Sequence, residues 1–302
     1  MRFSVQLATE RVDRPDEFLT ASAIGEMARA AEEAGFDACF VTDHPIPEDG
    51  WLASGGHHAV DPFVALAVAA AATERILLHT NLLVLPYRNP FLTAKAVATL
   101  DVASRGRVVL GVGAGYLAGE FAALGVDVGE RNELADEALD AMKCAWTGAS
   151  VSFEGRHFRA EEVRALPRPV QRPHPPLWIG GNSKRAIRRA VEHGDGWAPF
   201  PAGGRMAERT GTAAIRGLED LRARIGYARE HAERVGRTAP LDVAFIPFGF
   251  RMTPGEPADL DALLEALPAY EAAGVTWLSL GIPCHDRAEY HTKLTHLAAT
   301  LK

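Results

Sequence analysis

The chain of 302 residues is 47% hydrophobic and 24% charged, which is the composition of an ordinary soluble globular protein. Its formal net charge of −7 gives no overall attraction for nucleic acid, so we expect no nucleic-acid partner. No apolar run approaches the ~18 residues that a membrane-spanning helix needs, so we expect no membrane contact. The three cysteines, Cys39, Cys144 and Cys284, form no CxxC pair and no disulfide framework, which favours a reducing compartment and a cytoplasmic protein.

Patterns typical of strands and of helices alternate along the whole sequence. A helix over residues 61–72, for example, begins with Asp61 as its cap and Pro62 at its first position. Eight strand–helix units predict an α/β fold, a (β/α)8 TIM barrel, in a single domain that spans residues 1–302. The expected strands are residues 3–7, 38–42, 76–85, 107–113, 177–180, 196–198, 242–248 and 276–280.

The helices that follow these strands are marked by apolar periodicity and by their end residues. The helix over residues 21–34 has apolar residues at helical spacing and stops at Gly35, a residue that favours a helix end. Residues 147–176 break the alternation with a small hairpin and proline-rich turns, so we interpret them as an insertion between the fourth helix and the fifth strand. Residues 199–212 are expected to form a loop. The remaining expected helices are residues 92–102, 132–146, 183–193, 213–235, 259–273 and 287–301.

A barrel of this kind carries its chemistry at the carboxyl ends of its strands. Strand one contains no histidine, which argues against the His-x-His of a metal hydrolase, and we expect no metal site. Strands four and seven end without a carboxylate, which argues against a retaining glycosidase. The stretch Gly111-Val-Gly113-Ala-Gly115-Tyr116 is no dinucleotide-binding fingerprint, because Tyr116 stands where the third glycine belongs. Glycine, amide and aromatic residues remain, and they suit a flat, polar cofactor.

The start of the helix after strand five predicts an anion site. Backbone N–H groups at a helix N-terminus, a hydroxyl or amide cap and two cations together favour a phosphate group. The alternative is an ordinary helix cap with solvated basic side chains. The residues concerned are Gly180, Gly181, Asn182, Ser183, Lys184 and Arg185.

Several polar residues lie at strand ends or in the loops that follow them. His44 follows strand two beside Asp43, a position that suits a functional role as well as a structural one. Asn81 lies inside an otherwise apolar strand and needs a hydrogen-bond partner, either in the core or on a cofactor. His57 and His58 lie in a glycine-rich loop, where we expect them to be solvated.

A set of short motifs extends over nearly the whole chain. The stretches are Asn81-Leu-Leu-Val-Leu-Pro86, Arg88-Asn-Pro90, Thr99-Leu-Asp-Val-Ala-Ser-Arg-Gly-Arg107, Leu110-Gly-Val-Gly-Ala-Gly-Tyr116, Glu120-Phe121, Gly125, Arg131, Asp136-Glu137, Trp146 and Pro176-Leu-Trp-Ile-Gly-Gly-Asn182. Together they resemble the bacterial luciferase-like superfamily, and most closely its branch that depends on the deazaflavin coenzyme F420. Each stretch alone is a weak signal, whereas the combination is a strong one.

The resemblance implies a (β/α)8 barrel with an insertion, which binds a flavin or deazaflavin at the carboxyl ends of its strands. It also implies a non-proline cis peptide in strand three, which maps to Asn81-Leu82, and a histidine after strand two, which maps to His44. Ala114 stands where flavin-dependent luciferases have an arginine for the flavin phosphate, which favours F420 over FMN. Ala114 and Glu48 also differ from the glutamate and tryptophan of the sugar-phosphate dehydrogenases in the F420 branch.

We therefore expect an F420-dependent oxidoreductase that transfers a hydride between the deazaflavin C5 and an unidentified small-molecule substrate. The alternatives are an FMN-dependent luciferase-like monooxygenase and a non-catalytic, cofactor-binding member of the fold. His44 is the expected catalytic residue, a proton donor and acceptor whose tautomer is held by Asp43 or by a backbone carbonyl. The expected cofactor-binding residues are Asp43, Asn81, Leu82, Gly113, Ala114, Gly115, Tyr116, Gly180, Gly181, Asn182, Ser183, Lys184 and Arg185.

The second helix also predicts a partner chain. Residues 63–72 are apolar on all sides, whereas a barrel helix needs only one apolar stripe. The resemblance likewise implies dimers that form through the second and third helices, so we expect a homodimer. The alternative is a face covered by neighbouring helices alone.

Overall fold

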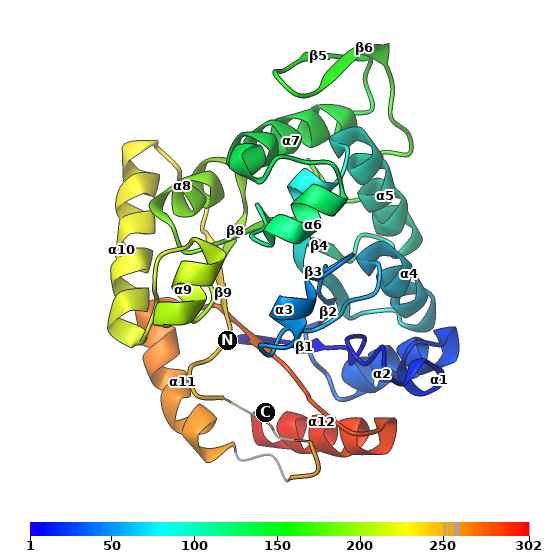
Figure 1. The fold of residues 1–302 in the computed structure, drawn as a ribbon, viewed down its shortest axis with the longest axis vertical. Helices are drawn as coiled ribbons and strands as arrows, with labels where there is room; N and C mark the ends of the chain where they lie inside the picture. The colour runs from blue at the N-terminus through cyan, green and yellow to red at the C-terminus, as the bar shows by residue number, and fades with distance from the viewer. Residues whose placement is uncertain (251, 253, 257–259, 302) are drawn as a thin grey trace.

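Eight parallel strands close into a barrel at the centre of the molecule (Figure 1). The computed structural model describes residues 1–250, 252, 254–256 and 260–301. Around the barrel the strands follow the order β1, β2, β3, β4, β7, β8, β9 and β10, and β10 pairs with β1. The predicted (β/α)8 barrel is confirmed. The strands are β1 (Arg2–Gln6), β2 (Ala38–Val41), β3 (Leu77–Val84), β4 (Val108–Gly113), β7 (Leu177–Gly180), β8 (Gly196–Ala198), β9 (Asp242–Phe245) and β10 (Trp277–Leu280).

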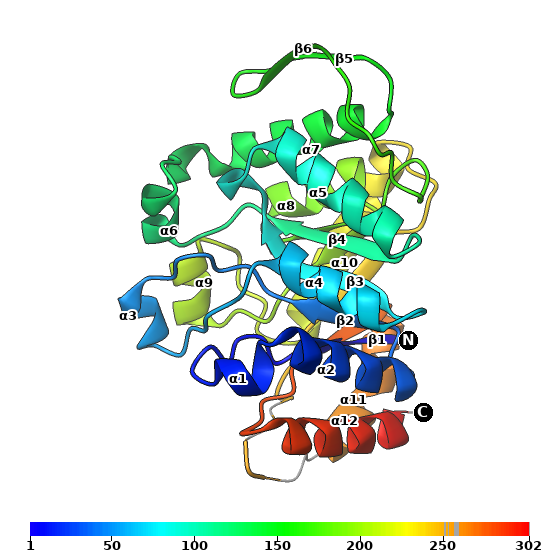
Figure 2. The same ribbon diagram turned by 90° about the vertical axis from the view of Figure 1, so that its right-hand side faces the viewer.

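A long helix follows each of these strands and packs on the outside of the barrel (Figures 1 and 2). The Asp61 side chain caps α4 as predicted, by accepting hydrogen bonds from the N–H groups of Phe63 and Val64 at 3.0 and 3.1 Å. None of the described helices combines the length and the apolar composition needed to cross a membrane. The helices are α2 (Ala21–Glu33), α4 (Pro62–Ala72), α5 (Pro90–Ala103), α7 (Arg131–Trp146), α8 (Lys184–His193), α10 (Leu218–Arg234), α11 (Asp261–Ala273) and α12 (Arg287–Leu301).

Four short helices that the sequence did not predict lie at one end of the barrel. Helices this short show too little of the 3.6-residue period to be recognised. The prediction of a loop over residues 199–212 is wrong, because this segment contains the helix α9. The next helix, α10, begins at Leu218 rather than at the predicted residue 213. In Figure 2 the short helices lie on the left, away from both chain termini. They are α1 (Pro15–Phe18), α3 (Asp49–Leu52), α6 (Ala118–Ala123) and α9 (Gly204–Thr210).

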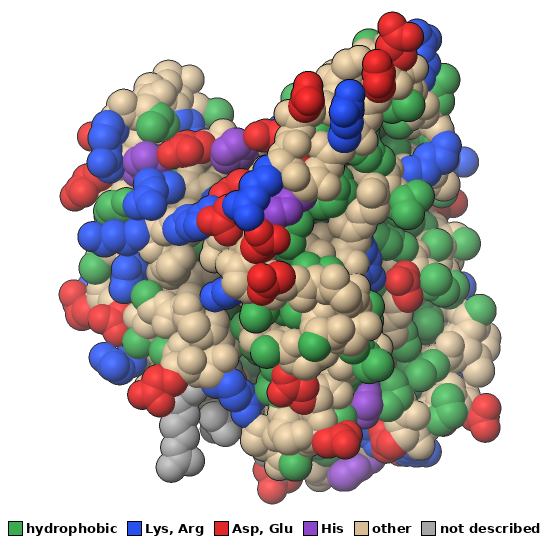
Figure 3. Space-filling view, turned by 45° about the horizontal axis from the view of Figure 1, so that its top comes forward, with side chains coloured by type: hydrophobic (Ala, Val, Ile, Leu, Met, Phe, Trp, Pro, Cys, Tyr) green, Lys and Arg blue, Asp and Glu red, His purple; other side chains and the backbone are tan. Residues whose placement is uncertain are grey.

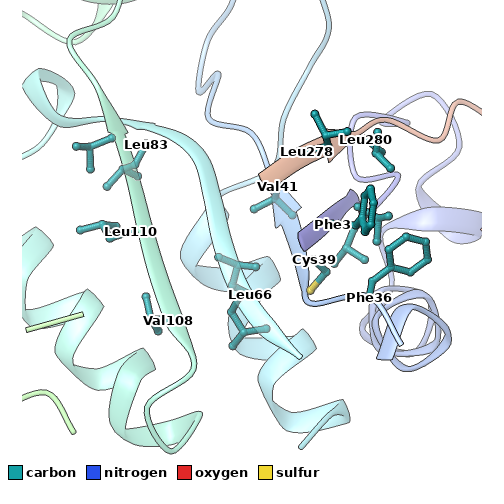
Figure 4. Close-up of a cluster of buried hydrophobic side chains, with 14 of the residues drawn as sticks. Phe3, Phe36, Cys39, Val41, Leu66, Leu83, Val108, Leu110, Leu278 and Leu280 are labelled. Carbon is teal, nitrogen blue, oxygen red and sulfur yellow. The ribbon is translucent and has the colours of Figure 1, made fainter. Parts of the chain in front are cut away.

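Side chains that alternate along the strands form two hydrophobic layers. The outward-facing ones pack under the helices, as Figure 4 shows for Cys39, Val41 and Leu110. The inward-facing ones fill the barrel, where the rings of Trp178 and Trp277 lie with their centroids 5.0 Å apart. The interior is therefore a packed core, and a binding site must lie at an end of the barrel.

The predicted insertion lies between α7 and β7. Its strands β5 (Val151–Glu154) and β6 (Arg159–Val163) pair as an antiparallel hairpin that projects at the top of Figures 1 and 2. The carboxylate of Glu137 on α7 accepts hydrogen bonds from the backbone N–H groups of Arg156, His157 and Phe158 at 3.1, 3.0 and 2.7 Å. A helix of the barrel wall thus holds the turn of the hairpin.

Asp101 holds the later part of the insertion against α5. Its buried carboxylate accepts hydrogen bonds from the N–H groups of Val170 and Gln171 and from the Gln171 amide, at 2.7, 3.0 and 2.7 Å. All three bonds meet one buried carboxylate, so its removal breaks them together.

We expect Asp101→Ala to lower the free energy of unfolding by about 3 kcal/mol, because it leaves the N–H groups of residues 170 and 171 without their acceptor. Urea unfolding followed by circular dichroism measures this change. Thr99→Ala, on the exposed side of the same helix, is the matched control and should alter stability by less than about 0.5 kcal/mol. Equal unfolding midpoints for Asp101→Ala and the parent protein would contradict the prediction.

Candidate active site

The predicted site residues gather at the end of the barrel where the carboxyl ends of the strands meet. They lie in the last residues of β3, β4 and β7 or in the segments that follow β2, β4 and β7, and these four strands are consecutive neighbours in the barrel. The pairing of Val84 with Gly113, and of Val112 with Ile179, places adjacent strand ends side by side. The short helices α3, α6 and α9 surround this end, which we call the mouth (Figures 1 and 2).

Leu82 forms the floor of the mouth. The peptide Asn81–Leu82 is cis, as the resemblance implied, and the pairing of β3 with β4 shifts register around it. A Cβ atom on Gly111 or Gly180 would lie 2.9 or 2.0 Å from a terminal carbon of the Leu82 side chain. The two glycines therefore leave the space that Leu82 fills. The Asn81 amide beside it is partly exposed and forms no hydrogen bond with any described residue.

His44 meets a buried carboxylate at the mouth. Its Nδ1 lies 3.3 Å from Oε2 of Glu120, whose side chain is 0% exposed. The same oxygen accepts the Tyr87 hydroxyl at 2.8 Å, and Oε1 accepts the N–H of Ile46 at 3.3 Å. Glu120 therefore orients the imidazole and is itself held by two further donors.

Aromatic rings pack around the His44 imidazole. The centroid distances are 4.4 Å to Trp51, 5.0 Å to His57 and 6.1 Å to Tyr116. The prediction that His57 is solvated is wrong, because its Nε2 lies 3.2 Å from the Thr42 hydroxyl and its ring packs on two others. Burial lowers the pKa of His57 to about 4, so this ring is neutral at physiological pH.

The carboxylates of Asp43 and Glu48 are both bonded within the protein. Asp43 accepts the N–H of Val84 at 2.9 Å and the guanidinium of Arg88 at 3.2 Å, and burial raises its pKa. Glu48 accepts the N–H of Gly119. The expectation that Asp43 holds the tautomer of the neighbouring imidazole is wrong, because Asp43 binds the end of β3 and Arg88, whereas the imidazole meets Glu120.

The loop after β4 passes close over α6. Gly115 has a φ of +77°, and a Cβ atom there would lie 2.6 Å from Val84 and 2.9 Å from Phe121, so only glycine fits. Burial raises the pKa of Tyr116 to about 12, and its hydroxyl stays protonated. Gly113 and Ala114 are partly exposed before it.

The start of α8 is capped by Ser183, whose hydroxyl accepts the N–H of Ala186 at 3.1 Å. Gly181 has a φ of +105° and turns the chain into the helix. The Asn182 amide is buried and donates to the carbonyls of Phe200 and Ala213 at 2.9 and 3.0 Å. Asn182 therefore positions the loop after β8 with its side chain, which is not available to a ligand.

The two cations of the predicted anion site bind elsewhere. Arg185 pairs with Glu133 and Asp136 of α7 at 3.0 and 2.8 Å. The Lys184 ammonium lies 5.2 Å from the centre of the Tyr227 ring. Both side chains thus have partners other than a phosphate. A long side chain at a helix start can reach a carboxylate or an aromatic ring on a neighbouring helix, so its position in the sequence does not fix its partner.

Arg131, the first residue of α7, is a better placed cation. Its guanidinium donates to the Val128 carbonyl at 2.8 Å, and its second terminal nitrogen lies 3.6 Å from where a Cβ atom on Gly211 would be. The next residue, Thr212, accepts the N–H of Asn182 at 3.0 Å, so Arg131 lies beside the start of α8. No carboxylate among the described residues forms an ion pair with it.

Residues 1–295 match the family described as luciferase-like monooxygenase. The chain belongs to this family. Members similar in sequence include an uncharacterised protein of Mycobacterium tuberculosis, 29% identical over 91% of this chain and 92% of its own length. An F420-dependent glucose-6-phosphate dehydrogenase of Beutenbergia cavernae is 33% identical over 80% of this chain and 75% of its own. An FMNH2-dependent dimethylsulfone monooxygenase of Pseudomonas putida is 32% identical over 71% of this chain and 56% of its own.

Solved structures show the same fold. An F420-dependent secondary alcohol dehydrogenase in complex with an F420–acetone adduct superposes with a TM-score of 0.75 at 19% identity, over 100% of this chain and 99% of that one. The monooxygenase RslO1 of Streptomyces bottropensis superposes with a TM-score of 0.75 at 22% identity, over 100% and 98%. The chain is therefore an oxidoreductase of the luciferase-like family, and two of the relatives similar to it in sequence are named as F420-dependent and as FMNH2-dependent.

The sequence did not predict several mouth residues of this family member. Trp51 and Tyr87 lie in segments without a recognisable pattern, and Glu120 was noticed only as part of a matching stretch. No local sequence pattern indicates that the Glu120 carboxylate contacts the ring of His44, which lies 76 residues earlier in the chain. No group of three or more His, Cys, Asp or Glu side chains in the described part of the chain could hold a metal ion.

A second acid, Glu10, lies beyond the carboxyl end of β1. The Gln6 amide donates to its Oε2 at 3.3 Å. Arg11, the next residue, pairs with Asp13 at 2.9 Å instead of with Glu10. Burial raises the pKa of the Glu10 carboxyl to about 7.

This raised pKa should make the stability of the protein depend on pH. The folded carboxyl keeps its proton up to about pH 7, whereas the unfolded chain loses it near pH ~4.3, so the free energy of unfolding falls between those values. Glu10→Gln is neutral throughout and escapes this loss. Relative to the parent protein it should therefore be more stable at pH 8 than at pH 5, by up to about 3 kcal/mol in urea unfolding. Parallel pH profiles of the two proteins would refute this.

Proposed function

We propose that this family member is an F420-dependent oxidoreductase that transfers a hydride between C5 of the deazaflavin and a small organic substrate. The observation that carries the proposal is the pairing of His44 with the buried Glu120 beside the Leu82 floor. Hydride transfer to or from carbon is usually coupled to a proton. An imidazole oriented by a carboxylate accepts and returns a proton near neutral pH.

The mouth fits a flat ring system with an anionic end. Leu82 is an apolar floor, and a Cβ atom on Gly113 would lie 3.6 Å from it, so the wall beside the floor is free of side chains. The Asn81 amide can bond to a polar ring edge. The first N–H groups of α8 have no partner within the helix and suit a phosphate group. When bound, the deazaflavin supplies or accepts a hydride at C5.

His44 holds the proton that accompanies the hydride. Trp51 and His57 cover the imidazole and keep water from it. His57 does not compete as a base, because its lowered pKa of about 4 makes it a weak proton acceptor.

The choice of F420 over FMN rests on two observations. Ala114 provides no cation where the flavin-dependent luciferases have an arginine. The F420-dependent relative from Beutenbergia cavernae matches a larger part of the chain than the FMNH2-dependent relative from Pseudomonas putida. Arg131 is the cation that we assign to the anionic end, in place of Arg185.

Fluorescence titration of the purified protein with F420 and with FMN tests the cofactor. We expect F420 to bind at least tenfold more tightly. Arg131→Ala should weaken F420 binding about tenfold, the loss of one charge-assisted hydrogen bond, whereas Arg185→Ala should change it less than about twofold. Tighter binding of FMN would favour the monooxygenase instead, and binding of neither would favour a non-catalytic member of the fold.

His44→Asn tests the proton role in the same preparations. Asparagine keeps a hydrogen-bonding group but does not titrate, so F420 should bind within about twofold of normal while its reduction by a panel of small alcohols slows ~10²-fold or more. The matched control is His58→Asn, an exposed histidine of the same loop, which should leave both quantities unchanged. A loss of turnover below tenfold would show that His44 only hydrogen-bonds the ring.

We also propose that the protein is a homodimer joined through α4 and α5. These helices are neighbours on the barrel wall, and their outer side chains Val64 and Leu92 are 66% and 72% exposed. Figure 3 shows hydrophobic side chains gathered on the right-hand flank, the side on which Figure 1 has these two helices. A second copy would cover this apolar face by two-fold symmetry.

Light scattering at micromolar concentration should show twice the mass of the chain. Leu92→Glu places a charge in the apolar face and should convert the protein to monomers. Val235→Glu, at an apolar and exposed position just after α10, is the matched control and should leave the dimer intact. A monomeric parent protein would refute the proposal.

A further inference from the structure

We infer that Glu120 is a positioning residue that fixes the tautomer of His44, with the proton on Nδ1 and the lone pair of Nε2 available to the substrate. The catalytic meaning of this inference rests on the proposed function. The tautomer itself is a property of the chain alone and can be read without any cofactor.

The groups around Glu120 leave its carboxylate only the role of acceptor. The N–H of Ile46 can only donate. Burial and the hydrogen bond to Glu120 raise the pKa of Tyr87 far above its usual value, so its hydroxyl keeps its proton and donates. Both oxygens of Glu120 thus accept hydrogen bonds, and in its carboxylate form the group has no hydrogen of its own to donate. In that form the ring nitrogen 3.3 Å from Oε2, Nδ1 of His44, carries the hydrogen.

No cation competes with His44 for the Glu120 carboxylate. No arginine or lysine in the described part of the chain pairs with this carboxylate. Arg88, which follows β3 at the same end of the barrel, is bound to Asp43 and Asp61 at 3.2 and 3.4 Å. The imidazole is therefore the side chain that meets Glu120 together with the Tyr87 hydroxyl.

Local structure brings Glu120 beneath the imidazole. The positive φ of Gly115 lets the loop after β4 cross Phe121 at close range. The Phe121 ring then packs edge-on to Tyr87 at 4.8 Å, which places the phenol and the carboxylate side by side. Glu48 binds the backbone of Gly119 and ties α6 to the loop that follows the histidine.

With Nδ1 engaged, Nε2 is the nitrogen left for the substrate. A proton taken up at Nε2 places the positive charge of the imidazolium beside the Glu120 carboxylate. The other titratable or charged groups around this pair are Asp43, Glu48, His57, Tyr87, Arg88, Tyr116 and, next to Tyr116, Arg209.

Long-range ¹⁵N–¹H NMR of cofactor-free protein labelled with ¹⁵N-histidine reads the tautomer directly. His44→Asn identifies the signals of His44 by their loss. At pH 8 the parent protein should show a proton on Nδ1 and none on Nε2. A proton on Nε2 would overturn the inference, whether or not any variant folds.

Glu120→Gln tests the cause. Its amide can donate as well as accept, so the population with the proton on Nε2 should rise. Tyr87→Phe is the matched control, because it removes the other donor to the same oxygen and keeps the carboxylate, and His44 should then retain the proton on Nδ1. An unchanged tautomer in Glu120→Gln would overturn the role of the carboxylate.

Turnover and F420 binding, measured on the same variant, distinguish a positioning role of Glu120 from a purely structural one. Glu120→Gln should lower turnover at least tenfold while F420 binds within about twofold of normal. A changed tautomer with undiminished turnover would overturn the positioning role. If F420 does not bind at all, the proposed function fails while the NMR result still decides the tautomer.

Discussion

The mouth depends on a steric constraint inside the barrel. Gly111 and Gly180 have no side chains, and Leu82 occupies the space that they leave, so close to Gly180 that even a methyl group there would collide with it. The indoles of Trp178 and Trp277 fill the interior of the barrel. A flat ligand therefore meets a solid, apolar floor, and polar chemistry is confined to the rim above it.

Carboxylates that bind backbone N–H groups hold the loops around this floor. Asp43 binds the end of β3, Asp101 and Glu137 hold the two parts of the insertion, and Glu32 accepts three consecutive N–H groups before β3. In each case a side-chain carboxyl group accepts hydrogen bonds from donors that a loop would otherwise leave to water. Glu120 differs because one of its partners is the His44 imidazole. The same carboxylate therefore holds a loop, through the N–H of Ile46, and contacts a side chain that can carry a proton.

The start of α8 shows that the sequence position of a long side chain does not determine its partner. Backbone N–H groups point along the axis of α8 whatever its side chains do, so a helix start after a strand is a dependable anion site. Arg185 lies at that start, but two carboxylates of α7 draw its guanidinium to the outer surface. Arg131 comes from the neighbouring helix α7, and its position beside this turn could be seen only in the tertiary structure.

The sequence by itself determined the alternating strands and helices, the insertion, the placement of His44 and the α8 turn at strand ends, and the position of Asn81 inside β3. These features follow from local periodicity, capping residues and the rule that parallel strands end together. The short helices around the mouth were missed, because they are too short to show a period. Only the tertiary structure decided that His44 meets Glu120 rather than Asp43 and that the His57 ring packs against His44 and Trp51. The contact of His44 with Glu120 joins residues far apart in the chain and depends on how closely one loop, at Gly115, passes over another segment.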